Sequence, residues 1–304
     1  MFRTPCPEQG RFLEDLLVST PHVWPRAHTT AALLHRDLEH VANELVGLTA
    51  TGGALLPRYL DWALGSASRL QRCLHAADID RLIRTRTFWA ALSLDSDSLA
   101  AQHLVNSERS DRQRHLHDVV ESLAKFVARF QGVPETAAVL VADTNVLIGH
   151  AVELAEVDWH ARLPGLVHEQ EHLRIVVPLV VIDELDRLKR HHDKTVRSGA
   201  RAMLKAIHKH VGDRIDEAHI LSGGPLGRGK TVTLEVLAES PDHVRLPSAD
   251  DEIVDVAARL TAMLGTRVMM ITYDTGADIR AGARALRHQR IRHQDTSGQA
   301  GTGQ

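Results

Sequence analysis

The sequence of 304 residues has little of several features that would assign a protein to a class at once. Its two cysteines, Cys6 and Cys73, provide neither a disulfide framework nor a zinc site of paired cysteines. The longest apolar stretch, Ile175 to Ile182, is far shorter than the ~20 residues needed to span a bilayer. The first residues also lack the apolar run of a signal peptide. We therefore expect a cytoplasmic, reduced protein with no membrane partner.

Neither sign of charge predominates, because 36 Lys and Arg residues stand against 39 Asp and Glu residues, for a formal charge of −3. Nucleic-acid-binding proteins are usually basic, so this balance at first disfavours nucleic acid as a partner. With 25% charged and 43% apolar residues, the composition is that of an ordinary folded protein and excludes disorder. A chain of this length is expected to form about two domains.

Residues 1–130 have the pattern of helices and no alternating pattern of a strand. Apolar side chains recur every three or four residues in two stripes, from Leu34 to Leu48 and from Leu116 to Phe130. Asp78 and Asp97 are expected to cap two of the helices. We therefore predict an antiparallel helical bundle. The tryptophans that we expect to anchor its core or an interface, rather than to stack on bases, are Trp24, Trp62 and Trp89.

A linker is expected at residues 131–137, where Gly132 and Pro134 would stop a helix. Beyond it, short apolar runs alternate with helical segments, which is typical of a parallel sheet covered on both faces. The three expected strands are 137–142, 173–177 and 267–272. Residues 138–294 are therefore predicted to form a three-layer α/β domain, followed by a flexible polar tail at residues 295–304.

Acidic residues follow the expected strands or begin the helices next to them. These acids are Asp143, Asp183, Glu184, Asp250, Asp251 and Asp274. Singly, each has an ordinary explanation as a helix cap, a turn residue or part of a solvated helix face. Together they place several like charges at one edge, because the carboxyl ends of parallel strands meet there. A divalent cation would neutralise these charges, and carboxylate oxygens without cysteine or histidine suit Mg²⁺ or Mn²⁺.

Four motifs in this region resemble those of the PIN-domain nucleases, and they occur in the order of that family. The segments that carry the resemblance are Val139–Ile148 (VLVADTNVLI), Val177–Lys189 (VPLVVIDELDRLK), Asp250–Ile253 with the later Ala257 and Ala258, and Thr272–Asp274. The resemblance extends from Val139 to Ile291, so it leaves the helical region uncovered.

The resemblance implies a ribonuclease that hydrolyses phosphodiester bonds of single-stranded RNA with one or two Mg²⁺ or Mn²⁺ ions. The metal-binding catalytic acids that it implies are Asp143, Glu184, Asp250 and Asp274. The orienting residues that it implies are Asn145 and Thr272. Asp251 stays an alternative or an assistant to Asp250, and Asp278 is either an auxiliary acid or a solvated helix residue. Two cations ~4 Å apart activate a water and stabilise the leaving oxygen without a nucleophilic side chain. The implied products carry a 3′ hydroxyl and a 5′ phosphate.

Basic residues just after the second motif and in a Gly-rich turn are candidates for holding the RNA strand. These residues are Arg187, Lys189, Arg190, Lys194, Arg201, Lys205, Arg228 and Lys230. Arg201, Lys205 and Lys209 share one helix face by their spacing. An ordinary solvated helix surface explains the same pattern equally well.

Three other interpretations stay open. Residues 224–231 match the nucleotide-binding pattern GxxxxGK[ST], but the alternating residues after Lys230 predict a strand, so a β-hairpin turn with Ala218–Ser222 as the partner is favoured. A PIN fold could bind RNA or protein without cutting, although four intact acids argue against this. A toxin of a toxin–antitoxin pair is disfavoured by the additional helical region, which could instead form a homodimer interface, bind a protein partner or select substrates.

Overall fold

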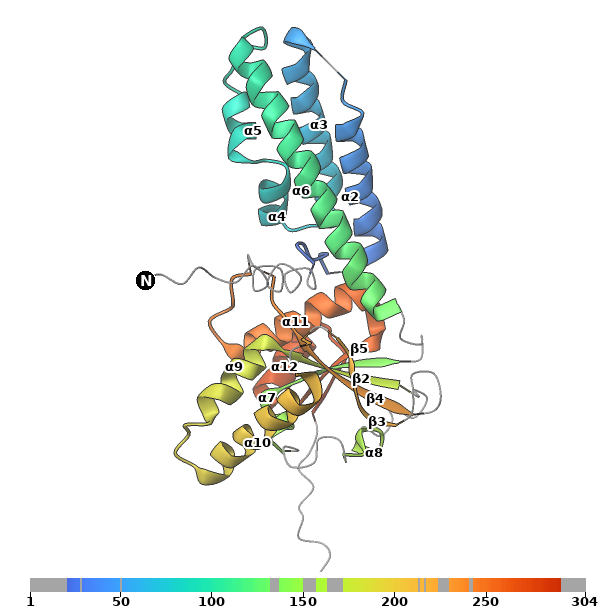
Figure 1. The fold of residues 1–304 in the computed structure, drawn as a ribbon, viewed down its shortest axis with the longest axis vertical. Helices are drawn as coiled ribbons and strands as arrows, with labels where there is room; N and C mark the ends of the chain where they lie inside the picture. The colour runs from blue at the N-terminus through green and yellow to red at the C-terminus, as the bar shows by residue number, and fades with distance from the viewer. Residues whose placement is uncertain are drawn as a thin grey trace, which may run out of the picture. The chain divides into compact units, whose positions relative to one another are not determined.

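The computed structural model describes residues 21–27, 29–49, 51–131, 137–149, 157–162, 172–212, 214–215, 217–223, 230–240 and 243–290. The chain divides into two compact units, which are considered separately (Figure 1). The first comprises Met1–Gly132 with Glu239–His243 and Ala262–Gly265, and the second comprises the remaining segments. Most of the predicted linker and all of the predicted tail lie outside the described residues.

The first unit is helical, as the apolar stripes predicted. Its elements are α2 (Ala31–Val46), a 3₁₀ turn (Gly52–Ala54), α3 (Leu55–Leu70), α4 (Ala76–Leu82), α5 (Arg86–Ala91) and α6 (Leu99–Gln131). Helices α2, α3 and α6 pack against one another, and α4 and α5 also pack on α6. Leu34 to Leu45 on α2 and Leu116 to Phe130 on α6 supply buried side chains to the core at the predicted spacing.

The starts of two helices differ from the prediction. Asp78 lies in the first turn of α4, where it pairs with Arg81 at 3.1 Å, and His75 is the N-cap residue. For α6, the Ser98 hydroxyl oxygen accepts from the Ala101 N–H at 3.1 Å, the bond that a capping side chain makes. The predicted caps at Asp78 and Asp97 are therefore wrong, because α4 begins after His75, which makes no side-chain capping bond, and α6 begins after Ser98, which does.

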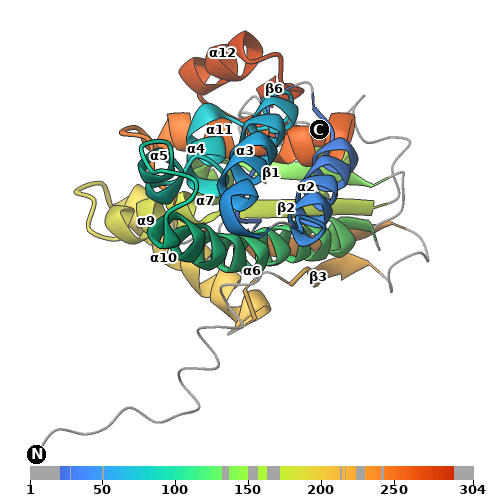
Figure 2. The ribbon, with the colours of Figure 1, turned by 90° about the horizontal axis from the view of Figure 1, so that it is seen from above.

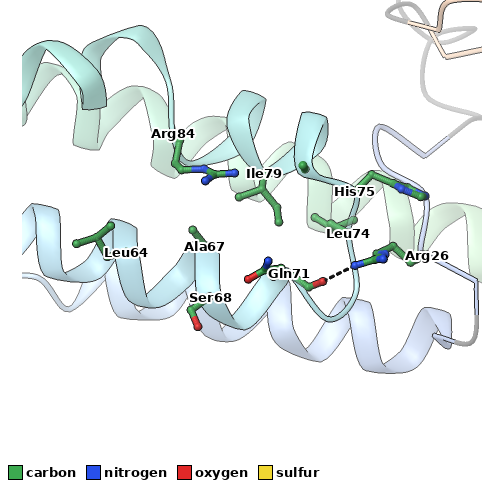
Figure 3. A pocket seen from close by; sticks show the side chains of 10 residues that line it. Arg26, Leu64, Ala67, Ser68, Gln71, Leu74, His75, Ile79 and Arg84 are labelled. Atoms are coloured by element: carbon green, nitrogen blue, oxygen red, sulfur yellow. Dashed lines mark hydrogen bonds between the residues drawn. The ribbon is translucent and has the colours of Figure 1, made fainter.

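The tryptophans of the first unit differ in exposure. Trp62 is buried and donates its indole N–H to the Val41 carbonyl at 3.1 Å, and Trp24 packs edge-on against Phe126. Trp89 is 57% exposed, so it is not part of the core. A cavity of about 400 Å³ lies between α3 and α4, with Ala67 and Ile79 among the residues that line it (Figure 3).

The second unit is built on a six-stranded sheet in the order β3-β4-β2-β1-β5-β6 (Figure 2). The strands are β1 (Ala138–Ala142), β2 (His172–Pro178), β3 (His219–Gly223), β4 (Thr231–Leu237), β5 (Val268–Thr272) and β6 (His288–Arg290). All neighbouring pairs are parallel except β3 and β4, which are antiparallel. Strand β6 is too short and polar to be predicted from its sequence pattern.

Helices cover this sheet, and their bounds follow the strands closely. They are α7 (Thr144–Gly149), α8 (Trp159–Arg162), α9 (Leu179–Leu188), α10 (Lys194–Val211), α11 (Ala249–Leu264) and α12 (Thr275–Ala283), with a 3₁₀ turn at Gly265–Arg267. Every residue of β1, β2, β4 and β5 is buried, so both faces of the central sheet are covered. The predicted three-layer α/β architecture is confirmed.

Two further predictions concern the Gly-rich turn and the membrane. Strand β4 begins at Thr231 and pairs antiparallel with β3, so the Gly-rich segment is followed by a strand, as predicted, and not by the helix of a phosphate-binding loop. Residues 224–229 themselves lie outside the described residues. None of the helices that the structure describes combines the length and apolarity needed to cross a membrane.

A buried ion pair joins the centre of the sheet. Arg174 on β2 is 2% exposed and Glu235 on the neighbouring β4 is fully buried, with the Arg174 Nε 2.5 Å from Glu235 Oε2. The alternation of apolar residues in β4 predicted a strand but not this pair, because its partners are 61 residues apart in the chain. The whole strand is buried, so the charged side chain needs a partner inside the fold.

Candidate active site

Asp143 follows β1 directly and lies at the carboxyl edge of the parallel strands. Its side chain is 2% exposed, its backbone N–H donates to the Ile271 carbonyl at 3.1 Å, and the Thr272 hydroxyl donates to its Oδ2 at 2.7 Å. Burial raises the pKa of this carboxyl to about 6, and the negative charges of Asp250 and Glu184 act in the same direction. The hydrogen bond from Thr272 opposes this shift.

Glu184 reaches the same region from α9, which begins directly after β2. The Thr144 hydroxyl, one residue after Asp143, donates to Glu184 Oε2 at 2.6 Å. Arg187, one turn further along α9, lies 3.1 Å from Glu184 Oε1. One oxygen of the carboxylate therefore contacts the start of α7, and the other faces a cation on its own helix.

Asp250 and Asp251 lie in the first turn of α11 and share a cationic partner on α12. The Arg280 Nη2 is 2.6 Å from Asp250 Oδ2, and its Nε is 3.3 Å from Asp251 Oδ1. Both acids are about two-fifths exposed, in contrast to the buried Asp143. Of the two, Asp250 raises the pKa of Asp143, which locates its charge near that carboxyl.

Asp274 is the N-cap residue of α12, two residues beyond the end of β5. Its side chain accepts from the Ala277 N–H at 2.7 Å, and its own N–H donates to the Thr272 hydroxyl oxygen at 2.9 Å. A chain of hydrogen bonds thus runs from Asp274 through Thr272 to Asp143. Asp274 is exposed, so its carboxylate combines a capping role with access to solvent.

Two other predicted residues lie outside this set of contacts. Asn145 is exposed in the first turn of α7. Asp278 is 3.6 Å from the His288 Nε2, at the start of β6. The structure therefore links Asp143, Glu184, Asp250 and Asp274 through shared hydrogen bonds or charge, and it places the side chain of Asp278 beside β6.

The donor chemistry fits an open divalent-cation site. Carboxylate oxygens are the ligands that Mg²⁺ and Mn²⁺ prefer, and Asp143 is buried where two other acids repel its charge. Within the part of the chain that the structure describes, no three Asp, Glu, His or Cys side chains converge into a closed metal cage. Mg²⁺ is commonly held by one or two carboxylates together with waters and substrate phosphate, so an open arrangement suits it.

The comparison with known protein families agrees with this geometry. A family model described as PIN domain matches residues 140–292, which is half of the chain and includes all four acids. The chain belongs to the PIN-domain family. Members of this family are generally nucleases and usually depend on a metal ion. No curated protein matches the sequence.

The predicted RNA-binding residues of the PIN domain divide into two groups. Those on or near α9 and α10 are Arg187, Lys189, Arg190, Lys194, Arg201 and Lys205. Helix α10 packs against both α9 and α7, the helices that carry Glu184 and Thr144. Gly199 allows the close approach to α7, because a Cβ at this position would lie 2.8 Å from the Ile148 Cγ2.

Lys230 lies apart from the acids. It precedes β4, which is parallel to β2 and β1, so it is at the amino end of the strands and Asp143 is at the carboxyl end. Lys230 lines a cavity of about 240 Å³ together with Trp159 and Ser222. Arg228 lies outside the described residues.

Three residues of the site were not singled out from the sequence. Thr144 stands inside the first motif, where only its neighbours Asp143 and Asn145 were chosen. Arg280 contacts acids that are 29 and 30 residues earlier in the chain, a pairing that no local pattern reveals. Arg245 precedes α11 and pairs with Asp183 on α9 at 2.6 Å, which ties together the elements that carry Glu184 and Asp250.

Proposed function

We propose that this PIN domain is a divalent-metal-dependent endoribonuclease that hydrolyses single-stranded RNA. The observation that carries the proposal is the environment of Asp143. A carboxyl that is almost fully buried beside two other acids lowers the stability of the fold. A protein with no use for this group would gain stability by replacing it. A bound cation would neutralise these negative charges and would in turn bind the substrate phosphate.

The residues of the site have separate roles in this proposal. Asp143, Glu184 and Asp250, with Asp274 at the edge, would hold one or two Mg²⁺ or Mn²⁺ ions. When bound, the cation activates water and stabilises the charge that develops on the leaving oxygen. Thr272 holds the Asp143 carboxylate by donating to Oδ2, and Thr144 does the same for Glu184.

Hydrolysis in this arrangement needs no covalent bond to the protein. Water adds to the phosphorus, the bond from phosphorus to the 3′ oxygen breaks, and that oxygen takes a proton. The products then carry a 3′ hydroxyl and a 5′ phosphate. The exposed cations of α9 and α10 support single-stranded RNA as the substrate, since they lie on helices that pack beside the acids.

The substrate class can be tested with end-labelled single-stranded RNA, duplex RNA and single-stranded DNA of one sequence. With Mn²⁺, the full chain should cut the single-stranded RNA internally, leave 5′ phosphates and lose all activity in EDTA. Faster cleavage of either other substrate would contradict the assignment to single-stranded RNA. Cleavage that persists in EDTA would contradict the mechanism.

A scaffold that binds RNA or protein without cutting is the second candidate. The ion pairs Arg187–Glu184 and Arg280–Asp250 favour it, because they neutralise two of the acids from within the chain. In that case the protein would bind the labelled RNA tightly and leave it intact in the presence of Mn²⁺. The burial of the Asp143 carboxyl beside two other acids would then lack an explanation, which is why the nuclease is preferred.

A further inference from the structure

Arg280 is a cation of the site that contacts two of the candidate acids. It lies in the sixth position of α12, and its guanidinium spans the first turn of α11, with contacts of 2.6 Å to Asp250 Oδ2 and 3.3 Å to Asp251 Oδ1. Its side chain is 38% exposed, so the pair is accessible to solvent and to ions. The geometry therefore joins two neighbouring acids to a single internal positive charge.

The guanidinium also lies beside the turn that carries the fourth acid. A Cβ at Gly276 would lie 3.0 Å from Asp274 Oδ1 and 3.4 Å from the Arg280 Nη1. The carboxylate of Asp274 and the guanidinium of Arg280 thus both lie close to the space that a side chain at position 276 would fill. Arg280 consequently lies near Asp274 as well as in contact with Asp250 and Asp251.

A cation bound by Asp250 would meet this positive charge. A divalent ion prefers the same carboxylate oxygens that Arg280 contacts, and two cations on one carboxylate repel each other. Binding of the metal must therefore weaken or displace the ion pair between Arg280 and Asp250. Asp251 offers the displaced guanidinium a second acceptor that is already 3.3 Å away.

A purely structural role for Arg280 would be to join α12 to α11. The next turn of the same helices already contains such a contact, because Arg284 Nη1 is 3.0 Å from Asp255 Oδ1. Asp255 also pairs with Arg259 on its own helix. The Arg284–Asp255 pair joins the same two helices outside the candidate acids, so it provides a matched control for Arg280.

We propose that Arg280 is a positioning residue that competes with the divalent cation for Asp250 and so sets the cation concentration that the site requires. This inference rests on the proposed metal site. Because Arg280 holds Asp250 when the cation is scarce, the site needs a higher concentration of the metal ion to be half-occupied. When the cation binds, the guanidinium moves to Asp251.

The test measures Mn²⁺ binding to the full chain without RNA, from the electron paramagnetic resonance signal of free Mn²⁺. Arg280→Gln removes the competing charge and should lower the dissociation constant about fivefold, which corresponds to about 1 kcal/mol for an exposed ion pair. Arg280→Lys retains the charge and Arg284→Gln removes the control pair, so both should stay within about twofold of the wild type. Arg280→Met is a second neutral variant, used if the glutamine variant fails to fold by circular dichroism.

Asp143→Asn separates failure of this inference from failure of the metal site. If Asp143→Asn weakens Mn²⁺ binding but the neutral variants of Arg280 bind as the wild type or more weakly, the competition is refuted and the metal site stands. If the wild type binds no Mn²⁺, or Asp143→Asn binds it equally well, both proposals are overturned. Tighter binding in Arg280→Gln and Arg284→Gln alike would assign the effect to net charge alone and would also refute the proposal.

Discussion

At the level of single residues, the buried carboxyl of Asp143 lowers the stability of the folded protein. Its carboxyl is 2% exposed, and burial together with the charges of Asp250 and Glu184 raises its pKa to about 6. Near neutral pH the folded protein must therefore hold a charged group that is more stable in the unfolded chain. This is the pattern expected of a residue retained for chemistry rather than for stability.

Asp143→Asn is expected to stabilise the protein at neutral pH in EDTA. A shift from 3.8 to about 6 means that the folded state favours the protonated acid, so the wild type loses stability as pH rises through this window. The loss amounts to as much as ~3 kcal/mol above pH 6 and vanishes below pH 4. Urea unfolding of both proteins at a series of pH values measures the difference.

The control for this prediction is Asp186→Asn on α9. Asp186 is exposed, and its hydrogen bond with Lys189 lowers the pKa of its carboxyl, so no gain in stability at neutral pH is expected. An Asp143→Asn variant that is less stable than the wild type at pH 7.5 would show that burial of the charged Asp143 carboxylate does not destabilise the fold.

At the scale of elements, the sheet depends on a charged pair that sequence patterns do not reveal. Arg174 and Glu235 lie on adjacent strands, and both are buried by the layers above and below. Such a pair contributes little net stability compared with well-packed apolar residues, but each partner is costly without the other.

Single substitutions in this pair should therefore be much more damaging than the double substitution. Arg174→Met or Glu235→Leu alone should lower the free energy of unfolding by about 3–5 kcal/mol, because each removes the oppositely charged partner of a charge that stays buried. The double variant should recover most of this loss. A double-mutant cycle by urea unfolding measures the coupling, and additive effects would refute it.

Helix α10 is the element that we expect to hold the RNA strand. Arg201, Lys205 and Lys209 are exposed on its surface at a spacing of four residues. Changing all three to Gln should weaken binding of single-stranded RNA and reduce the slope of log K against log salt by about 2 units, since each phosphate contact contributes ~0.7.

The matched control changes three exposed cations of the first unit, Arg86, Arg114 and Lys125, to Gln. Filter binding to the Asp143→Asn background, which prevents cleavage, measures both variants at several salt concentrations. Equal losses in the two triple variants would show that net charge, and not the face of α10, governs binding.

At the scale of the whole molecule, the sequence predicted architecture better than contacts. Hydrophobic spacing identified the helical first unit and the α/β second unit. The reason is that the order of apolar residues shows whether a helix or strand is buried on one face or on both. The predicted position of Asp143 at the end of a buried strand agrees with the structure for the same reason. Caps at Asp78 and Asp97 failed, since neighbouring residues compete for each helix start.

Contacts between distant segments were beyond the sequence pattern. Arg280 meets Asp250, and Arg245 meets Asp183, only because the order of strands brings α12, α11 and α9 together. The near-neutral net charge of −3 likewise concealed the distribution of charge. It averages acids grouped at the carboxyl edge of the sheet with cations exposed on α9 and α10, so it did not exclude a nuclease.

The central claim is that Asp143 and a divalent cation together cut RNA. The most direct measurement is the rate of cleavage of end-labelled single-stranded RNA by the wild type, Asp143→Asn and Asp186→Asn, with Mn²⁺ at saturation. We expect Asp143→Asn to be slower by at least about 10³-fold while it still binds the RNA, and Asp186→Asn to retain the wild-type rate. Cleavage by Asp143→Asn at the wild-type rate would contradict this claim.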